Sequence, residues 1–248
     1  MAALWSAVVR PSLRGGDKGR RGSTESAQSR GSSESAGSKG RRSDEDDGGP
    51  VLAREACPKL VAAIAEIVRT ESDYVNALRT LTTGYMPRLQ PVLEGDERAA
   101  IFSNAVTILG VHVELLGRLE RAQASATLRQ EVAAVVAAFQ AILPFLKLYA
   151  SYCGNYVAAL GCLEHARSER HALASAIQRA EAEIATHRQG EGDLHLSSCL
   201  IRPVKRLCLY PLLLTALLKE FGAAEAAASA RAETAAGGGG GGAAAAGR

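Results

Sequence analysis

Apolar residues recur every three or four positions through the middle of the chain, a spacing that is typical of helices packed along one face. The pattern begins near Ala56 with Leu60, Ile64 and Ile67 and continues to Phe221. No segment in this stretch alternates apolar and polar residues as a half-buried strand does. The sequence therefore predicts an all-α fold, and the roughly 165 residues involved are enough to bury one sizeable core.

The periodicity predicts five helical stretches. The first ends near Gly84 and Pro87, and the others cover residues 96–121, 128–163, 168–187 and 194–221. Long helices joined by short loops make an elongated helical bundle.

Residues at the ends of these stretches predict how each helix starts or breaks. Asp96 and Ser168 are suitable N-caps for the second and fourth helices. Pro144 is expected to break or kink the third stretch, and Pro203 and Pro211 are expected to interrupt the fifth.

Both ends of the chain differ in composition from the middle. Residues 1–50 are rich in Ser, Gly and Arg and contain almost nothing to bury, so we expect this region to be disordered. Residues 222–248 form a low-complexity Ala/Gly tail, which we expect to be a frayed helix followed by flexible coil. The predicted helical domain is therefore residues 51–221.

The charge of the chain is nearly balanced, with 29 Lys and Arg against 26 Asp and Glu, a net charge of +3. Residues 51–221 contain 18 basic and 17 acidic side chains. This balance gives no field that would attract a polyanion, so we do not expect a nucleic-acid partner.

The cysteines and the apolar segments indicate the cellular compartment in which the protein functions. Five cysteines, without a C-x-x-C pair, indicate a reducing intracellular compartment. The sequence has no run of about 18 uninterrupted apolar residues, so we expect no transmembrane segment. We expect a cytoplasmic protein, with peripheral association with membranes left open.

Motifs for common enzyme chemistry are missing from the sequence. It contains no P-loop, no H-E-x-x-H, no G-x-S-x-G and no G-x-G-x-x-G. The five histidines lack tight ligand spacing, and a solvated side chain is the favoured interpretation of each. We therefore expect neither a cofactor nor a metal.

Three segments, in this order, carry the most information. They are Ile64–Leu78 (IAEIVRTESDYVNAL), Pro144–Tyr156 (PFLKLYASYCGNY) and Leu200–Leu214 (LIRPVKRLCLYPLLL). Together they resemble the three signature regions of the Dbl-homology (DH) domain, the module of Rho-family guanine nucleotide exchange factors that acts on the GTPase. The resemblance covers about residues 57–221.

The third segment is informative by its spacing alone. Leu196, Leu200 and Val204 begin a broad apolar stripe that continues to Leu218, whereas Ser198, Arg202, Lys205 and Leu209 recur on another face. One face can enter the bundle while the other stays available. Judged without the family, the basic cluster of Arg202, Lys205 and Arg206 is a solvated helix face, and Glu66 is an ordinary surface carboxylate.

The resemblance implies a function for these residues. It implies that the first and third signature helices lie side by side and bind a Rho-family small GTPase. Glu66 would contact switch I, Arg202 would contact switch II, and Val204 would face the part of the GTPase that distinguishes Rho, Rac and Cdc42 types. Lys205, Arg206 and Leu209 complete the predicted GTPase-binding set.

The chain departs from the family pattern in ways that keep alternatives open. Lys205 replaces a common Gln, and Leu209 replaces a Lys or Arg. The family's last helix continues beyond the Leu-Leu-Leu run, where this chain has Gly222 and the Ala/Gly tail, so the sequence predicts a domain that lacks the distal part of its last helix. The alternatives to an exchange factor are a catalytically degenerate DH-derived scaffold and a plain helical interaction protein.

Overall fold

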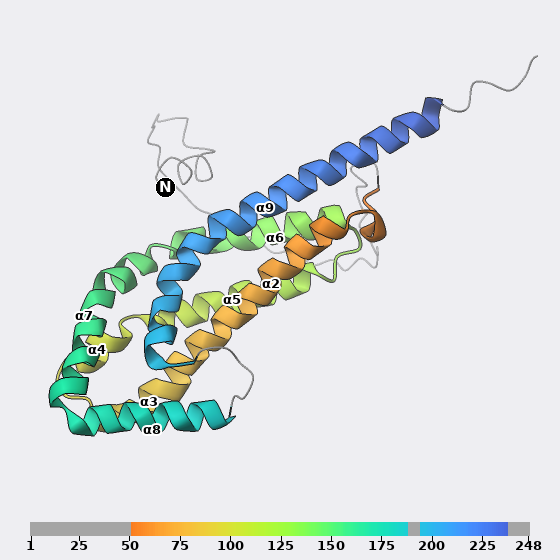
Figure 1. The fold of residues 1–248 in the computed structure, drawn as a ribbon. Helices are drawn as coiled ribbons and strands as arrows, with labels where there is room; N and C mark the ends of the chain where they lie inside the picture. The colour runs from red at the N-terminus through yellow and green to blue at the C-terminus, as the bar shows by residue number, and fades with distance from the viewer. Residues whose placement is uncertain (1–50, 188–193, 238–248) are drawn as a thin grey trace, which may run out of the picture. The chain divides into compact units, whose positions relative to one another are not determined.

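The computed structural model describes residues 51–187 and 194–237. All regular elements of these residues are helical, which confirms the predicted fold class (Figure 1). The longer helices are α2 (Pro58–Arg79), α5 (Ala105–Ala122), α6 (Leu128–Ile142), α7 (Leu148–Glu169), α8 (His171–His187) and α9 (Leu196–Gly237). The shorter elements are η1 (Arg54–Ala56), η2 (Thr80–Tyr85), α3 (Met86–Leu89), η3 (Gln90–Val92), α4 (Glu97–Phe102) and η4 (Leu143–Phe145). The predictions for residues 1–50 and for the tail beyond Gly237 lie outside the described residues.

The first helical stretch does not stop near Gly84, as the sequence predicted. Helix α2 continues through η2, one stretch of π-helix, directly into α3. A Cβ at Gly84 would lie 3.2 Å from Cδ1 of Ile184 in α8. The glycine therefore allows α8 to approach closely, and Pro87 is tolerated because it stands in the first turn of α3.

The predicted helix at 96–121 is two helices, α4 and α5. Ser103 separates them with a positive φ of 44°. The side chain of Asn104 donates to the backbone oxygen of Leu148, 2.9 Å away, so α7 holds the break in place. Asp96 stands at the N-cap position of α4, but its side chain makes no capping hydrogen bond.

The chain between α6 and α8 follows one prediction and contradicts another. Pro144 ends α6 as expected, because it lies in the short 3-10 turn η4. Ser168 is not an N-cap. It lies inside α7, where its hydroxyl donates to the backbone oxygens of Glu164 and His165.

A further correction concerns α9, which continues as one helix to Gly237, where the sequence predicted a last helix to about Phe221 and a frayed helix beyond it. Pro203 and Pro211 lie inside this helix and do not end it, and Figure 1 shows that the helix bends. The Ala-rich segment beyond Phe221 has high helix propensity.

The distal half of α9 also packs against the bundle. Ala228 is buried, Phe221 and Ala224 are partly buried, and Glu225 pairs with Arg129 of α6 at 3.0 Å. The prediction that the domain lacks this part of its last helix is therefore wrong.

Three helical stretches, Glu97–Ala122, Leu128–Phe145 and Leu196–Ala236, are long and apolar enough to cross a bilayer by length and composition. Length and composition alone therefore do not decide this point, and the absence of a transmembrane segment stays a prediction. Apolar residues of all three stretches, among them Ile108, Val135 and Leu213, are buried inside the bundle. Part of their apolar surface is thus used in packing between helices.

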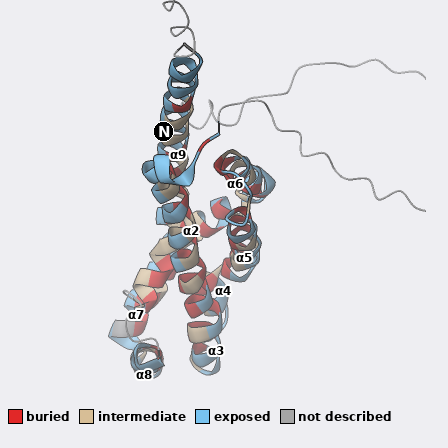
Figure 2. Ribbon diagram, turned by 90° about the vertical axis from the view of Figure 1, so that its right-hand side faces the viewer, coloured by how far each residue is buried: buried red, intermediate tan, exposed pale blue. Residues whose placement is uncertain are grey.

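Two apolar cores lie at different positions along α2 and α9. The first core contains Tyr74 and Leu78 from α2 with Leu196 and Leu200 from α9. The second core contains residues from the other part of each helix, such as Leu60 and Ile64 of α2 and Leu213 and Leu217 of α9. Figure 2 shows buried residues concentrated on the sides by which the helices face one another. The two cores place α2 and α9 against each other in antiparallel directions.

Candidate functional site

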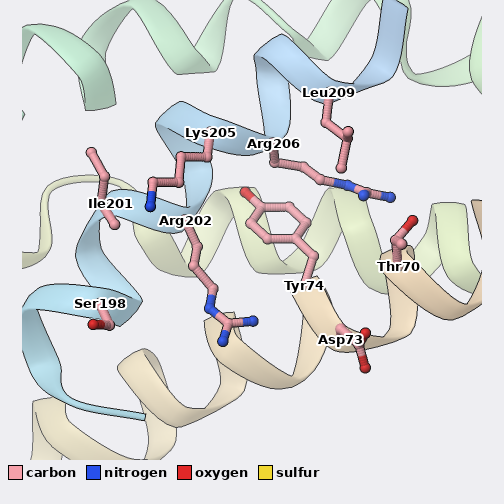
Figure 3. A pocket seen from close by; sticks show the side chains of 9 residues that line it. All are labelled: Thr70, Asp73, Tyr74, Ser198, Ile201, Arg202, Lys205, Arg206 and Leu209. Carbon is pink, nitrogen blue, oxygen red and sulfur yellow. The ribbon is translucent and has the colours of Figure 1, made fainter. Parts of the chain in front are cut away.

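A cavity of about 380 Å³ opens between α2 and α9. Its lining residues, shown in Figure 3, are Thr70, Asp73, Tyr74, Ser198, Ile201, Arg202, Lys205, Arg206 and Leu209. All of them except Ser198, which lies two residues before the third segment, come from the first and third of the segments singled out in the sequence. The structure thus brings two segments more than 120 residues apart into one concave surface, here named the α2–α9 pocket.

The predicted exposed face of the third segment lines this pocket. Ser198, Arg202, Lys205 and Leu209 recur at steps of three or four, so one side of α9 carries all of them. Lys205 is exposed, and Arg202 and Leu209 are half-buried. Leu209 also packs against the second core, which makes part of the wall apolar.

Charge in the pocket is mainly positive, with one acidic neighbour. Arg202 and Lys205 come from α9, and Asp73 comes from α2. Asp73 is paired with Arg69 one turn before it, with 3.3 Å between the two charged groups. Together with the apolar side chain of Ile201, the surface suits a partner segment that combines an acidic group with an apolar one.

Arg206 differs from its two basic neighbours because it is buried. Its side chain is only 3% exposed, and its Nε and Nη2 donate to Oε2 of Glu71 at 3.1 and 2.6 Å. The guanidinium also lies over the ring of Tyr210, 4.7 Å from its centroid. The prediction of a solvated cluster of three cations is therefore wrong for Arg206, whose charge is taken up inside the protein.

Two predicted residues do not line the pocket. Glu66 is exposed on α2, and its backbone oxygen accepts from the Thr70 hydroxyl at 2.8 Å, which places Glu66 one turn from the pocket. Val204 is half-buried, packs against the first core and does not line the pocket. Its contact with a partner stays a prediction.

A buried polar network lies directly beneath the pocket, between the two apolar cores. At its centre is Glu71, which is fully buried and accepts hydrogen bonds from Arg206, from Tyr210 at 2.9 Å and from His112 at 2.7 Å. Burial by itself raises the pKa of the Glu71 carboxyl. The hydrogen bonds and charge of His112 and Arg206 outweigh that effect and hold its pKa below the usual 4.5.

The network continues from His112 to the pocket through two tyrosines. The hydroxyl of Tyr149 lies 2.8 Å from Nε2 of His112 and 2.8 Å from the hydroxyl of Tyr74. Burial raises the pKa of Tyr74, Tyr149 and Tyr210 far above the usual value of 10, so all three hydroxyls keep their protons. Tyr74 is also a pocket residue, so the network ends at the pocket.

Sequence reasoning missed this network although two signals were present. Glu71 stands on the apolar face of α2, between Ile67 and Tyr74, and His112 stands on that of α5. A titratable residue at a core position implies a buried partner. The prediction of a solvated histidine is therefore wrong for His112, which is 0% exposed.

Among the residues that the structure describes, no three His, Cys, Asp or Glu side chains are placed to hold a metal. The site therefore consists of an open, cationic and partly apolar surface over a rigid polar base, an arrangement suited to binding a protein partner.

Comparison with known proteins decides the family. The sequence profile of the RhoGEF domain matches residues 63–233, more than half of the chain. The chain belongs to the RhoGEF domain family. The match includes both helices of the pocket and extends well into the distal half of α9, in agreement with the structure.

Individual relatives agree with this assignment. The chain is 29% identical over 157 residues to protein vav of Drosophila melanogaster, across 63% of this chain and 19% of the relative. It is 30% identical over 160 residues to Rho guanine nucleotide exchange factor 3 of Gallus gallus, across 64% of this chain and 29% of the relative. The chain thus spans less than a third of either relative, so the match concerns the RhoGEF domain and not their other parts.

Solved structures support the fold. The crystal structure of the linker and DH/PH domains of p115-RhoGEF superposes with a TM-score of 0.58 at 23% identity, over 67% of this chain and 50% of that chain. At this identity the likeness concerns the fold alone.

Proposed function

We propose that this RhoGEF domain is a guanine nucleotide exchange factor that promotes GDP release from a Rho-family small GTPase. The observation that carries the proposal is the α2–α9 pocket, because it joins the two segments that resemble the family's GTPase-binding regions. The family match and the relatives named as exchange factors support the same activity.

The proposed mechanism is differential binding without bond chemistry. A surface that holds the GTPase switches where they disturb the Mg²⁺ and phosphate sites stabilises the nucleotide-free form. By thermodynamic linkage, it weakens GDP binding by the same factor. GTP then refills the empty site because it is the more abundant nucleotide in the cell. We expect this encounter to take place in the cytoplasm.

Different residues have different parts in this proposal. Glu66 binds switch I from one turn beyond the pocket, and Arg202 binds switch II from its wall. Lys205 adds a second cation, and Leu209 offers an apolar contact. Arg206 does not reach the partner, because Glu71 occupies its guanidinium, and we assign it to the support of the surface.

Release of fluorescent GDP from a panel of Rho, Rac and Cdc42 type GTPases tests the proposal. Glu66→Ala and Arg202→Ala should each slow release about ten- to a hundredfold, since a charge-assisted contact made in the complex is worth roughly 1.5–3 kcal/mol. Circular dichroism should be unchanged, because neither side chain belongs to an apolar core.

Matched controls are available on other helices. Glu120→Ala in α5 and Arg179→Ala in α8 remove the same charges from exposed positions that do not line the pocket. Both should release GDP at the wild-type rate. Equal losses of release rate in these controls and in Glu66→Ala and Arg202→Ala would contradict the placement of the GTPase on α2 and α9.

A further inference from the structure

The base of the α2–α9 pocket is held from behind by side chains that do not line the pocket. Tyr74 and Arg206 line the pocket, yet their exposed fractions are only 3% and 4%. Their polar groups therefore face inward. The contacts that hold these two side chains in place therefore also hold the shape of the pocket.

Tyr74 has its partner on a helix outside the pocket, and Arg206 has its partner on α2, the other helix of the pocket. The hydroxyl of Tyr74 lies 2.8 Å from that of Tyr149 in α7, and Arg206 of α9 binds Glu71 of α2. The carbon Cζ of Arg206 also lies 5.8 Å from the ring centroid of Tyr74, so the two side chains are in contact.

His112 joins these two contacts into one relay. Its Nδ1 lies 2.7 Å from Oε1 of Glu71, and its Nε2 lies 2.8 Å from the hydroxyl of Tyr149. The relay runs from Tyr74 through Tyr149, His112 and Glu71 to Arg206, so it begins and ends at the base of the pocket and crosses α7 and α5 on the way.

Because the relay is buried, each of its side chains limits the positions that the next one can adopt. His112 and Glu71 are 0% exposed and Tyr149 is 2% exposed, so water does not replace a lost partner. A chain of hydrogen bonds in such surroundings is cooperative, and removal of one member leaves its neighbours with unsatisfied groups.

We propose that Tyr149 and His112 are positioning residues for nucleotide exchange, which act by holding Tyr74 and Arg206 at the base of the α2–α9 pocket. The proposal rests on the exchange activity proposed above. It adds two residues, on α7 and α5, that neither line the pocket nor were expected to take part in function.

The test compares two tyrosines one turn apart on α7. Tyr149→Phe removes a hydroxyl of the relay. Tyr152→Phe removes an equally buried hydroxyl, which donates to the backbone oxygen of Leu200 at 3.0 Å and is not part of the relay. Tyr149→Phe loses two buried hydrogen bonds between helices, to Tyr74 and to His112, and Tyr152→Phe loses one, to Leu200. A purely structural role therefore predicts that each variant loses activity in proportion to its loss of stability.

The positioning role predicts that only Tyr149→Phe slows GDP release, by about fivefold, whereas Tyr152→Phe releases GDP at the wild-type rate. Tyr74→Phe should cause a loss no larger than that of Tyr149→Phe, which also removes the contact with His112. The double variant should show no loss beyond that of Tyr149→Phe, because the link that Tyr74→Phe breaks is already broken. The proposal would be overturned if the fold-loss in release rate of the double variant equalled the product of the two single fold-losses. It would also be overturned if Tyr149→Phe and Tyr152→Phe lost the same fraction of the release rate.

A second measurement does not require a GTPase. The Nε–H of Arg206 should exchange slowly with solvent in nuclear magnetic resonance spectra of the wild-type protein and of Tyr152→Phe, and faster in Tyr149→Phe and His112→Leu. Unchanged protection in both of these relay variants would overturn the relay. If the wild-type protein acts on no GTPase of the panel, the proposed exchange function fails, and the Arg206 measurement still decides whether the relay holds the base of the pocket.

Discussion

Substitution of Glu71 tests the polar network that separates the two cores. Glu71→Ala leaves Arg206, with 3% of its side chain exposed, without a counter-charge, and it removes the acceptor of Tyr210 and His112. Breaking a buried ion pair in this way costs about 3–5 kcal/mol. The cost is a large part of the roughly 5–15 kcal/mol by which a domain of this size is stable.

Urea unfolding followed by circular dichroism at 222 nm measures the effect. Glu71→Ala should unfold at a much lower urea concentration than the wild-type protein. The pair Glu71→Met and Arg206→Met should cost less than the sum of the two single changes, because it leaves no unpaired charge. An unchanged midpoint for Glu71→Ala would refute the assignment of Glu71 as the centre of the network, and Glu66→Ala serves as the exposed control on the same helix.

The low pKa of Glu71 also predicts how stability depends on pH. A carboxyl whose pKa is lower in the folded than in the unfolded state contributes stability that is fully present above the unfolded value, near 4.5. That contribution is lost as the pH falls through the folded pKa. The wild-type protein should therefore lose more stability than Glu71→Gln on acidification below about pH 4.5. Parallel pH profiles of the two proteins would argue against a lowered pKa.

Two further predictions concern α9. A chain that ends after Gly222 loses the packing of Ala224 and Ala228 and the Glu225–Arg129 pair, so its melting temperature should fall by roughly 3–6 °C, whereas a chain that ends after Gly237 should melt as the full chain does. Equal melting temperatures for the two shortened chains would show that the distal half of α9 contributes nothing. Leu209→Lys restores the basic residue that the family resemblance predicts at this position, and it should speed GDP release at low salt with a gain that shrinks at high salt. A rate that does not change at either salt concentration would remove Leu209 from the proposed interface.

The fold could be predicted from sequence because the periodicity that defines helices is local. Helix ends were predicted less well, since they depend on neighbours that are distant in the sequence. Gly84 was taken for a stop, but it is the point where α8 approaches η2. The sequence predicts a tail after Phe221 because this Ala-rich segment lacks large apolar residues, yet its small side chains reach the second core, where Ala228 is buried.

Part of the site could also be predicted from the sequence, because the spacing of residues along one helix is local. Spacing along one helix correctly placed Arg202, Lys205 and Leu209 on the face that lines the pocket. Spacing could not show that Arg206 turns inward, because its partner, Glu71, lies 135 residues earlier in the chain. A charged residue on an apolar stripe is the sequence signal that would have revealed such a pair.

The most direct test of the exchange function is multiple turnover. A small amount of the chain, about one molecule to twenty of a Rho-family GTPase loaded with fluorescent GDP, is mixed with excess unlabelled GTP, and the loss of fluorescence is followed. Because an exchange factor is released when GTP binds, we predict accelerated release of GDP from all of the GTPase with at least one member of the panel. Acceleration limited to the fraction of GTPase equal to the added chain, or binding to nucleotide-free GTPase without accelerated release, would contradict an exchange factor and favour a scaffold.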